Sequence, residues 1–100
     1  MTYGDKRRKF AVMISKLIPF ALGLGYEVSL SDGMCRTGHI ENSFHYIGLA
    51  QDINLYKDGV YLTKTEDHSQ LGNYWESLDL HASWGGRWND GNHYSLGEER

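Results

Sequence analysis

Two short polar groups, far apart in the sequence, constrain the fold of this chain more than any other feature. Residues 43–52 carry His45 and Asp52, seven positions apart, and residues 84–94 carry His93. Two histidines, one carboxylate and an open position form a typical catalytic zinc site. Ligands so distant in sequence come from different elements, so a shared metal ion would hold these parts of a small sheet together.

Asp90 adds a spare carboxylate to this set. It lies three residues before His93, in the run 89–92, whose composition is also typical of turns. A carboxylate beside a catalytic zinc site is suited to act as the general base for a water molecule. Taken alone, Asp90 could be a turn residue, and His45 and Asp52 a buried hydrogen-bonded pair. The presence of all four residues, three of them suited to bind zinc and one to act as a base, favours the metal site.

Composition limits the other classes of fold and function. The 100 residues, 40% of them hydrophobic, predict one small domain over residues 1–100 with one modest core. The net charge of −3 is not that of a nucleic-acid-binding protein, which would usually be basic. The single cysteine, Cys35, excludes an internal disulfide framework, and we interpret it as inert.

The N-terminal segment has two interpretations. A basic run at 6–9 followed by apolar residues over 10–25 resembles a signal peptide, but a lysine and Pro19 interrupt the apolar run. The apolar residues recur with the spacing of an amphipathic helix, so we predict a structural helix over 6–22 with Asp5 as its N-cap. Pro19 is expected to kink this helix or end it early. The run is also too short to span a membrane, and a cleaved signal is the lesser alternative.

The rest of the chain predicts an α+β fold, with helices around a small, mainly antiparallel sheet. Lys57-Asp58-Gly59 is a strong hairpin signal between two of the strands. The predicted strands cover 26–30, 49–55, 60–63 and 92–95, and a second helix covers 69–78. The inward stripe of that helix would consist of Leu71, Tyr74, Trp75 and Leu78. A glycine-aromatic loop is expected between this helix and the last strand.

These motifs resemble those of a known family. The pattern Ser-x-His-x-x-Gly-x-Ala-x-Asp at 43–52 resembles the first metal motif of the zinc D-Ala-D-Ala carboxypeptidase and L-Ala-D-Glu endopeptidase family (peptidase family M15). The Asp-x-x-His motif at 90–93 is similar to its second. The segments 63–77 and 84–88 resemble small phage-type members used as endolysins, and the resemblance covers roughly residues 5–97.

The resemblance implies a Hedgehog/DD-peptidase-like zinc peptidase fold and a set of site residues. Zn2+ would be held by His45, Asp52 and His93. Asp90 would act as general base and acid, and Arg36 would face the polarised carbonyl group. Many members place Glu where this chain has Asp90, so the shorter acid would have to stand closer to the reacting water.

Further residues are candidates for the substrate site. The resemblance implies that Ser43 lines it, although Ser43 could also cap a turn. His39 would touch substrate or support a ligand, with a surface position as the alternative. Trp84 would form a wall of the substrate groove, or pack in the core around the neighbouring glycines. We interpret His68 as a helix-start residue and His81 as part of a surface loop.

The implied function is hydrolysis of an amide bond in bacterial peptidoglycan stem peptides. The small size favours a phage endolysin of the L-alanyl-D-glutamate endopeptidase type. A D-alanyl-D-alanine carboxypeptidase or dipeptidase is the alternative among enzymes. A catalytically inactive, zinc-stabilised module that binds the cell wall is the alternative from another class.

The resemblance also carries expectations about partners and location. The partner would be a bacterial peptidoglycan peptide, without nucleic acid or membrane insertion, and the protein would be a monomer. The single catalytic domain would have no separate wall-binding domain. Without a signal peptide or transmembrane segment, the enzyme would stay in the host cytoplasm until lysis and then reach the periplasm and cell wall.

Overall fold

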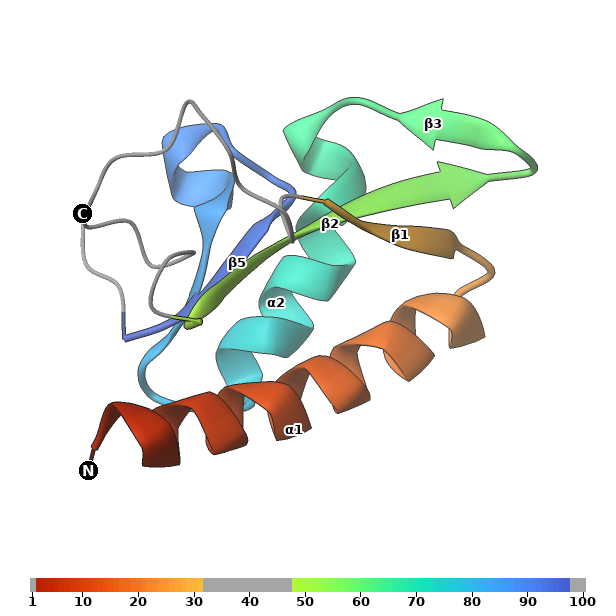
Figure 1. Cartoon of the computed structure of the whole chain (residues 1–100). Helices are drawn as coiled ribbons and strands as arrows, with labels where there is room; N and C mark the ends of the chain where they lie inside the picture. Colours follow the sequence, from red (N-terminus) through yellow and green to blue (C-terminus); the bar gives the residue numbers. More distant parts are fainter. Residues whose placement is uncertain (1, 32–47, 98–100) are drawn as a thin grey trace.

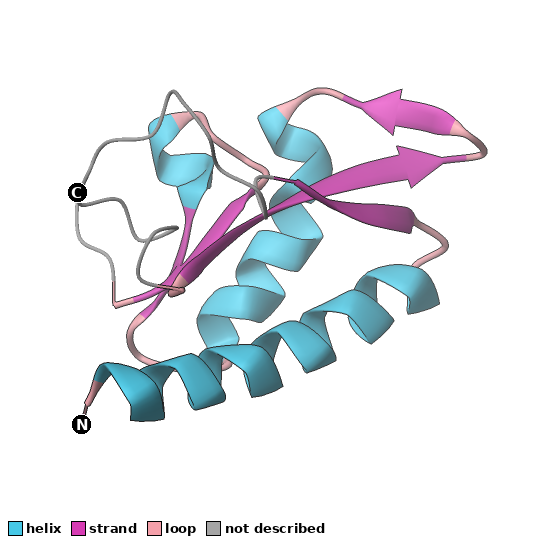
Figure 2. Ribbon diagram, viewed as in Figure 1, coloured by secondary structure: helices cyan, strands magenta, loops and turns pink. Residues whose placement is uncertain are grey.

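The computed structural model describes residues 2–31 and 48–97, and it places helices on one face of a five-stranded antiparallel sheet (Figures 1 and 2). The helices are α1 (Tyr3–Gly23) and α2 (Ser69–Ser77), with the short 3-10 helices η1 (Thr65–His68) and η2 (Gly85–Trp88). The strands are β1 (Glu27–Ser31), β2 (Ala50–Lys57), β3 (Val60–Leu62), β4 (Ala82–Trp84) and β5 (His93–Leu96). This arrangement confirms the predicted α+β fold with a small antiparallel sheet.

The long strand β2 organises the sheet. β1 pairs with it along one edge, while β3 pairs with its last residues, Leu55–Lys57, and β5 pairs with its first, Ala50–Asp52. β4 adds to the outer side of β5. The β2–β3 connection has positive φ angles at Asp58 (52°) and Gly59 (78°), as a tight two-residue hairpin turn requires, and confirms the predicted hairpin.

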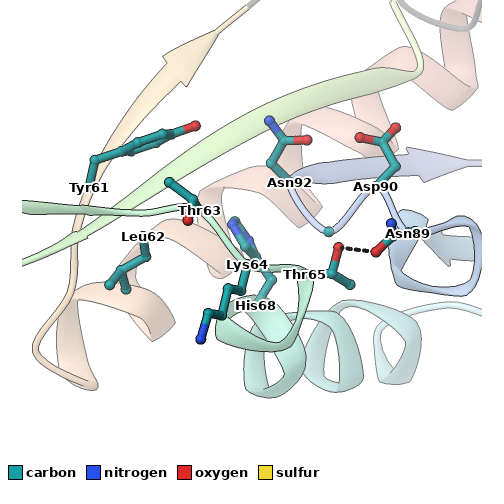
Figure 3. A pocket seen from close by; sticks show the side chains of 10 residues that line it. Tyr61, Leu62, Thr63, Lys64, Thr65, His68, Asn89, Asp90 and Asn92 are labelled. Carbon is teal, nitrogen blue, oxygen red and sulfur yellow. Dashed lines mark hydrogen bonds between the residues drawn. The ribbon is translucent and has the colours of Figure 1, made fainter.

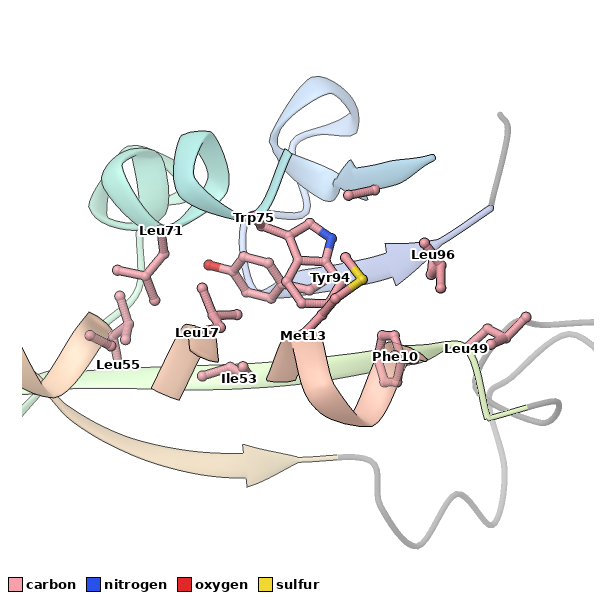
Figure 4. Packing of buried hydrophobic residues seen from close by; sticks show 12 residues of the cluster. Phe10, Met13, Leu17, Leu49, Ile53, Leu55, Leu71, Trp75, Tyr94 and Leu96 are labelled. Atoms are coloured by element: carbon pink, nitrogen blue, oxygen red, sulfur yellow. The ribbon is translucent and has the colours of Figure 1, made fainter. Parts of the chain in front are cut away.

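The hydrophobic core lies between the helices and one face of the sheet (Figure 4). Side chains alternate along a strand, so Ile53 faces the helices while its neighbour Asp52 lies on the opposite face. Trp75 of α2 is fully buried, and its indole nitrogen donates to the Ser95 carbonyl oxygen at 2.9 Å. The main contributors are Phe10, Met13, Leu17, Leu49, Ile53, Leu55, Leu71, Trp75, Tyr94 and Leu96. The helices thus stabilise one face and leave the other face to polar side chains.

The start of α1 differs from the prediction. The N-cap is Thr2, whose hydroxyl oxygen accepts a hydrogen bond from the Asp5 backbone N–H at 3.1 Å. Asp5 is the reciprocal member of a capping box, since its carboxylate accepts from the Thr2 backbone N–H at 3.1 Å. The assignment of Asp5 as the N-cap was therefore wrong by three positions.

Pro19 does not end α1, which continues to Gly23. Core contacts extend past the proline: Ala21 is fully buried, and Phe20 stacks on Tyr74 of α2 with ring centroids 4.1 Å apart. These contacts offset the backbone hydrogen bond that proline removes. The segment is a structural helix, as predicted. No helix among residues 2–31 and 48–97 is long and apolar enough to cross a membrane.

Two features of the sheet departed from expectation. The segment Ala82–Trp84, expected to be part of a loop, forms β4 and pairs with β5. In β1, predicted as a strand over 26–30, Leu30 is exposed although its pairing partner Ile53 on β2 is buried. Neither difference affects β2 or β5, the two strands that carry Asp52 and His93.

Candidate active site

Asp52 and His93 meet on the polar face of the sheet. They are directly opposite each other on the neighbouring strands β2 and β5. Nδ1 of His93 lies 3.2 Å from Oδ1 of Asp52, and His93 is buried while Asp52 remains partly exposed. Two residues separated by 41 positions are thus brought together by strand pairing.

The chemistry and spacing of this pair fit a zinc ion. Zinc bonds to nitrogen and oxygen are about 2.0–2.2 Å long, so two ligands on a tetrahedral ion lie about 3.3 Å apart. The observed separation of 3.2 Å matches that spacing. Within residues 2–31 and 48–97, no three His, Cys, Asp or Glu side chains are grouped so that they could hold a metal ion. The third predicted ligand, His45, lies outside the described residues and stays a prediction.

Asp90 is tied to His93 by a tight backbone turn. The His93 backbone N–H donates to the Asp90 carbonyl oxygen at 3.1 Å, and the Asp90 N–H donates to the Gly85 carbonyl oxygen at 2.9 Å. Asn89 takes the left-handed conformation with φ of 58°, which asparagine tolerates better than most residues. Asp90 and His93 are thus the ends of one turn, and its backbone hydrogen bonds fix the position of the Asp90 Cα atom relative to His93.

Gly85 makes room for this turn. A Cβ atom at position 85 would lie 2.2 Å from the Asp90 carbonyl oxygen and 2.9 Å from Cβ of His93. Real Cβ contacts are never as close as the first of these, so any side chain would displace the turn. The glycine in this position is thus required by the close approach of η2 to the residues of the site.

We expect Gly85→Ala to lower both stability and activity. Relieving the 2.2 Å contact has to move Asp90 or His93, and overpacking of this kind costs about 1–3 kcal/mol. Gly23→Ala is the matched control, because nothing lies within 4 Å of a Cβ built there. Thermal unfolding and peptide hydrolysis measured on both variants test the idea. Wild-type behaviour of Gly85→Ala would show that the turn is not sensitive to this position.

Trp84 supports the same turn from the helix side of the sheet. Its ring packs against Gly72 of α2 and Gly86 of η2, where added Cβ atoms would lie 2.1 and 2.4 Å from ring carbons. Its indole nitrogen donates to the Gly91 carbonyl oxygen at 2.6 Å. The packing interpretation of Trp84 is therefore confirmed, while a contact with substrate stays a prediction.

The structure describes some of the predicted site residues and not others. His81, which was not assigned to the site, is exposed, as expected for a surface loop. The structure brings together Asp52 and His93, with Asp90 three residues before His93. Four predictions lie outside the described residues and are neither supported nor contradicted by the fold: Arg36, His39, Ser43 and His45.

His68 is the helix-start residue that the sequence predicted, but neither its burial nor its partner was anticipated. It does end η1 and start α2, but it is 3% exposed, and its Nδ1 lies 2.7 Å from the hydroxyl oxygen of Tyr94. Burial lowers the pKa of His68 to about 4, so the ring is neutral at pH 7. Burial also raises the pKa of Tyr94. No local sequence pattern predicts the contact of His68 with Tyr94, because the two residues are 26 positions apart.

Comparison with known families shows which family has a sequence like that of this chain. Residues 37–96 match the family model of D-alanyl-D-alanine carboxypeptidase. The chain belongs to this family. The match covers more than half of the sequence and includes both motifs, 43–52 and 90–93, whereas Arg36 lies one residue before it. No curated protein matches the chain.

Membership identifies the chain as a peptidase of a family that acts on peptidoglycan. The contact between Asp52 and His93 then lies within the matched range, on strands that the fold holds side by side. The site therefore belongs to the part of the chain that carries the family likeness.

Proposed function

We propose that the protein is a zinc-dependent endopeptidase that hydrolyses an amide bond in bacterial cell-wall stem peptides. The observation that carries the proposal is the cross-strand contact of Asp52 with His93 at 3.2 Å, with Asp90 in the turn that leads into His93. Metal-assisted hydrolysis needs ligands suited to zinc and a nearby carboxylate that can act as a base. Asp52 and His93 are such ligands, and Asp90 is such a carboxylate.

Asp52, His93 and His45 would hold the metal ion. Zinc, when bound, would supply a Lewis acid that makes water more acidic and polarises the substrate carbonyl. The sheet contributes rigidity, since strand pairing sets the Asp52–His93 separation before any ligand binds. The buried position of His93 keeps competing water away from its ring.

Asp90 would move the proton. As general base it accepts a proton from the attacking water, and as general acid it delivers that proton to the leaving amine. Its backbone is fixed by the bonds to Gly85 and His93, while its partly exposed carboxylate can reach substrate. Arg36 is proposed to donate hydrogen bonds to the oxyanion that develops on the substrate carbonyl.

The bond that is cut defines two candidates. The likeness of the segments 63–77 and 84–88 to small phage enzymes supports an L-alanyl-D-glutamate endopeptidase that acts as an endolysin. The family description, D-alanyl-D-alanine carboxypeptidase, favours removal of a terminal D-alanine instead. As an endolysin, the protein would be a monomer made in the host cytoplasm that reaches the wall at lysis.

Digestion of purified peptidoglycan, followed by mass spectrometry of the fragments, tests this function. Endopeptidase activity should release stem peptides that begin at the D-glutamyl residue, and carboxypeptidase activity should shorten stems by one D-alanine. Adding chelator should stop either reaction. Fragments identical to those of an untreated wall, with zinc present, would contradict the proposal and favour an inactive binding module.

A further inference from the structure

A hollow of about 160 Å³ opens beside Asp90, and the proposed chemistry leaves most of its lining unused (Figure 3). One wall is the turn that contains Asp90, and the other is the link from β3 into η1 with His68 behind it. The lining residues are Tyr61, Leu62, Thr63, Lys64, Thr65, His68, Asn89, Asp90, Gly91 and Asn92. A group held here would lie next to the bond at which Asp90 acts.

His68 presents a hydrogen-bond donor to this hollow. The buried Tyr94 hydroxyl bonds only His68 Nδ1 among the described residues, and it has one hydrogen to place. Both groups are satisfied if Tyr94 donates to Nδ1, which leaves the proton of the neutral ring on Nε2. Among the described residues, every fully buried side-chain nitrogen or oxygen has a hydrogen-bond partner. Nε2 of His68 has no partner there, so it is not fully buried. Because His68 lines the hollow, we infer that Nε2 faces this open space.

Other donors lie around the same hollow. The Asn89 side-chain oxygen accepts from the Thr65 hydroxyl at 3.2 Å, which leaves the amide nitrogen of Asn89 without an acceptor among the described residues. Lys64 extends on the side away from Asp90, and its ammonium group forms no ion pair within residues 2–31 and 48–97 (Figure 3). The nearby carboxylate of Asp67 accepts from the Lys64 backbone N–H at 3.0 Å and does not line the hollow.

We propose that this hollow binds a carboxylate group of the substrate peptide. Its ligands are the Nε2–H of His68, the amide nitrogen of Asn89 and the ammonium group of Lys64. Hydrogen bonds to a charged acceptor are stronger than those to a neutral one, so these donors favour a carboxylate over a carboxamide. Asp90 repels the carboxylate toward the Lys64 side and so orients the peptide. The inference rests on the proposed function for the position of the scissile bond.

The test uses two L-alanyl-D-glutamyl peptides that differ in one group, the free α-carboxylate of the glutamyl residue or its carboxamide. Wild-type protein with zinc should show a lower KM for the acid than for the amide. Lys64→Gln should raise KM for the acid about threefold to tenfold and leave KM for the amide unchanged. Lys16→Gln removes an exposed charge from α1, away from the hollow, and should change neither value.

Asn89→Asp is the sharper variant. Aspartate also tolerates the left-handed backbone and keeps an acceptor for Thr65, but it replaces the free amide nitrogen by a negative charge. It should raise KM for the acid more than Lys64→Gln does, without raising KM for the amide. Nitrogen-15 NMR of the imidazole should show the Nε2–H tautomer of His68 at pH 7. The Nδ1–H tautomer would remove His68 from the set of ligands.

The outcomes separate this inference from the proposed function. Cleavage of both peptides with equal KM would overturn the carboxylate site while supporting the peptidase. If neither peptide is cleaved, the proposed function fails, and calorimetric binding of the same two peptides still tests the hollow. Equal dissociation constants for acid and amide would then overturn the inference, and tighter binding of the acid that Lys64→Gln abolishes would support it.

Discussion

Asp90→Asn is expected to abolish hydrolysis of wall peptides while leaving the zinc content and the fold unchanged. The turn around Asp90 is held by backbone hydrogen bonds to Gly85 and His93, which the substitution preserves. The carboxylate itself forms no hydrogen bond or ion pair with any other described residue, so asparagine fits in its place. Loss of one proton-transfer group typically lowers the rate by about 10²–10⁴-fold.

The control for this variant is Asp58→Asn. Asp58 occupies the exposed β2–β3 turn with φ of 52°, where asparagine is at least as suitable, and it is remote from the site in sequence and on the sheet. Its activity should equal that of the wild type. Zinc stoichiometry and hydrolysis need to be measured on the same preparations. Loss of zinc from Asp90→Asn would make Asp90 a ligand, and full activity would assign the base to another residue.

His93→Ala is expected to remove both zinc and activity. It deletes one of the two ligand candidates that the structure brings together and leaves Asp52 without the imidazole 3.2 Å away. Zinc at 100 times its dissociation constant would stabilise the wild type by about 2.7 kcal/mol, and the variant should gain nothing from the same concentration. Melting temperatures with zinc and with chelator, together with elemental analysis, measure this difference.

His81→Ala provides the matched control for the loss of a histidine. His81 is exposed and lies before β4, so its removal should leave zinc stoichiometry and the zinc-dependent rise in melting temperature unchanged. If His93→Ala retains one zinc per chain, the metal site proposed on β2 and β5 is wrong. If the wild type itself melts at the same temperature with and without verified zinc, the metal does not stabilise this fold.

Local sequence patterns predicted most of the secondary structure. The hairpin at Asp58 and Gly59 follows from the left-handed angles that these residues tolerate. The inward stripe of α2 follows from helical spacing, with Leu71 and Trp75 fully buried. In α1 the predicted N-cap, Asp5, was wrong because Thr2 takes that position. Pro19 does not end the helix early, since packing of Phe20 against α2 outweighs the missing hydrogen bond.

The site depended on information that local patterns do not contain. Asp52 and His93 were identified in the sequence as ligand types that could share a metal ion, and the resemblance to a family supported placing them in one site. Their contact arises from the pairing of β2 with β5, which no periodicity predicts. The His68–Tyr94 hydrogen bond was missed for the same reason, since it joins residues of unrelated segments.

The alternation of side chains along β2 limits how related sequences can differ in length. Ile53 belongs to the core and Asp52 to the polar face, and a strand repeats every two residues. Inserting or deleting one residue within Ala50–Lys57 would exchange the two faces, placing a carboxylate against the helices and an isoleucine opposite His93. Such an insertion or deletion would damage stability and chemistry together. Length differences are therefore expected in the turns that join the strands.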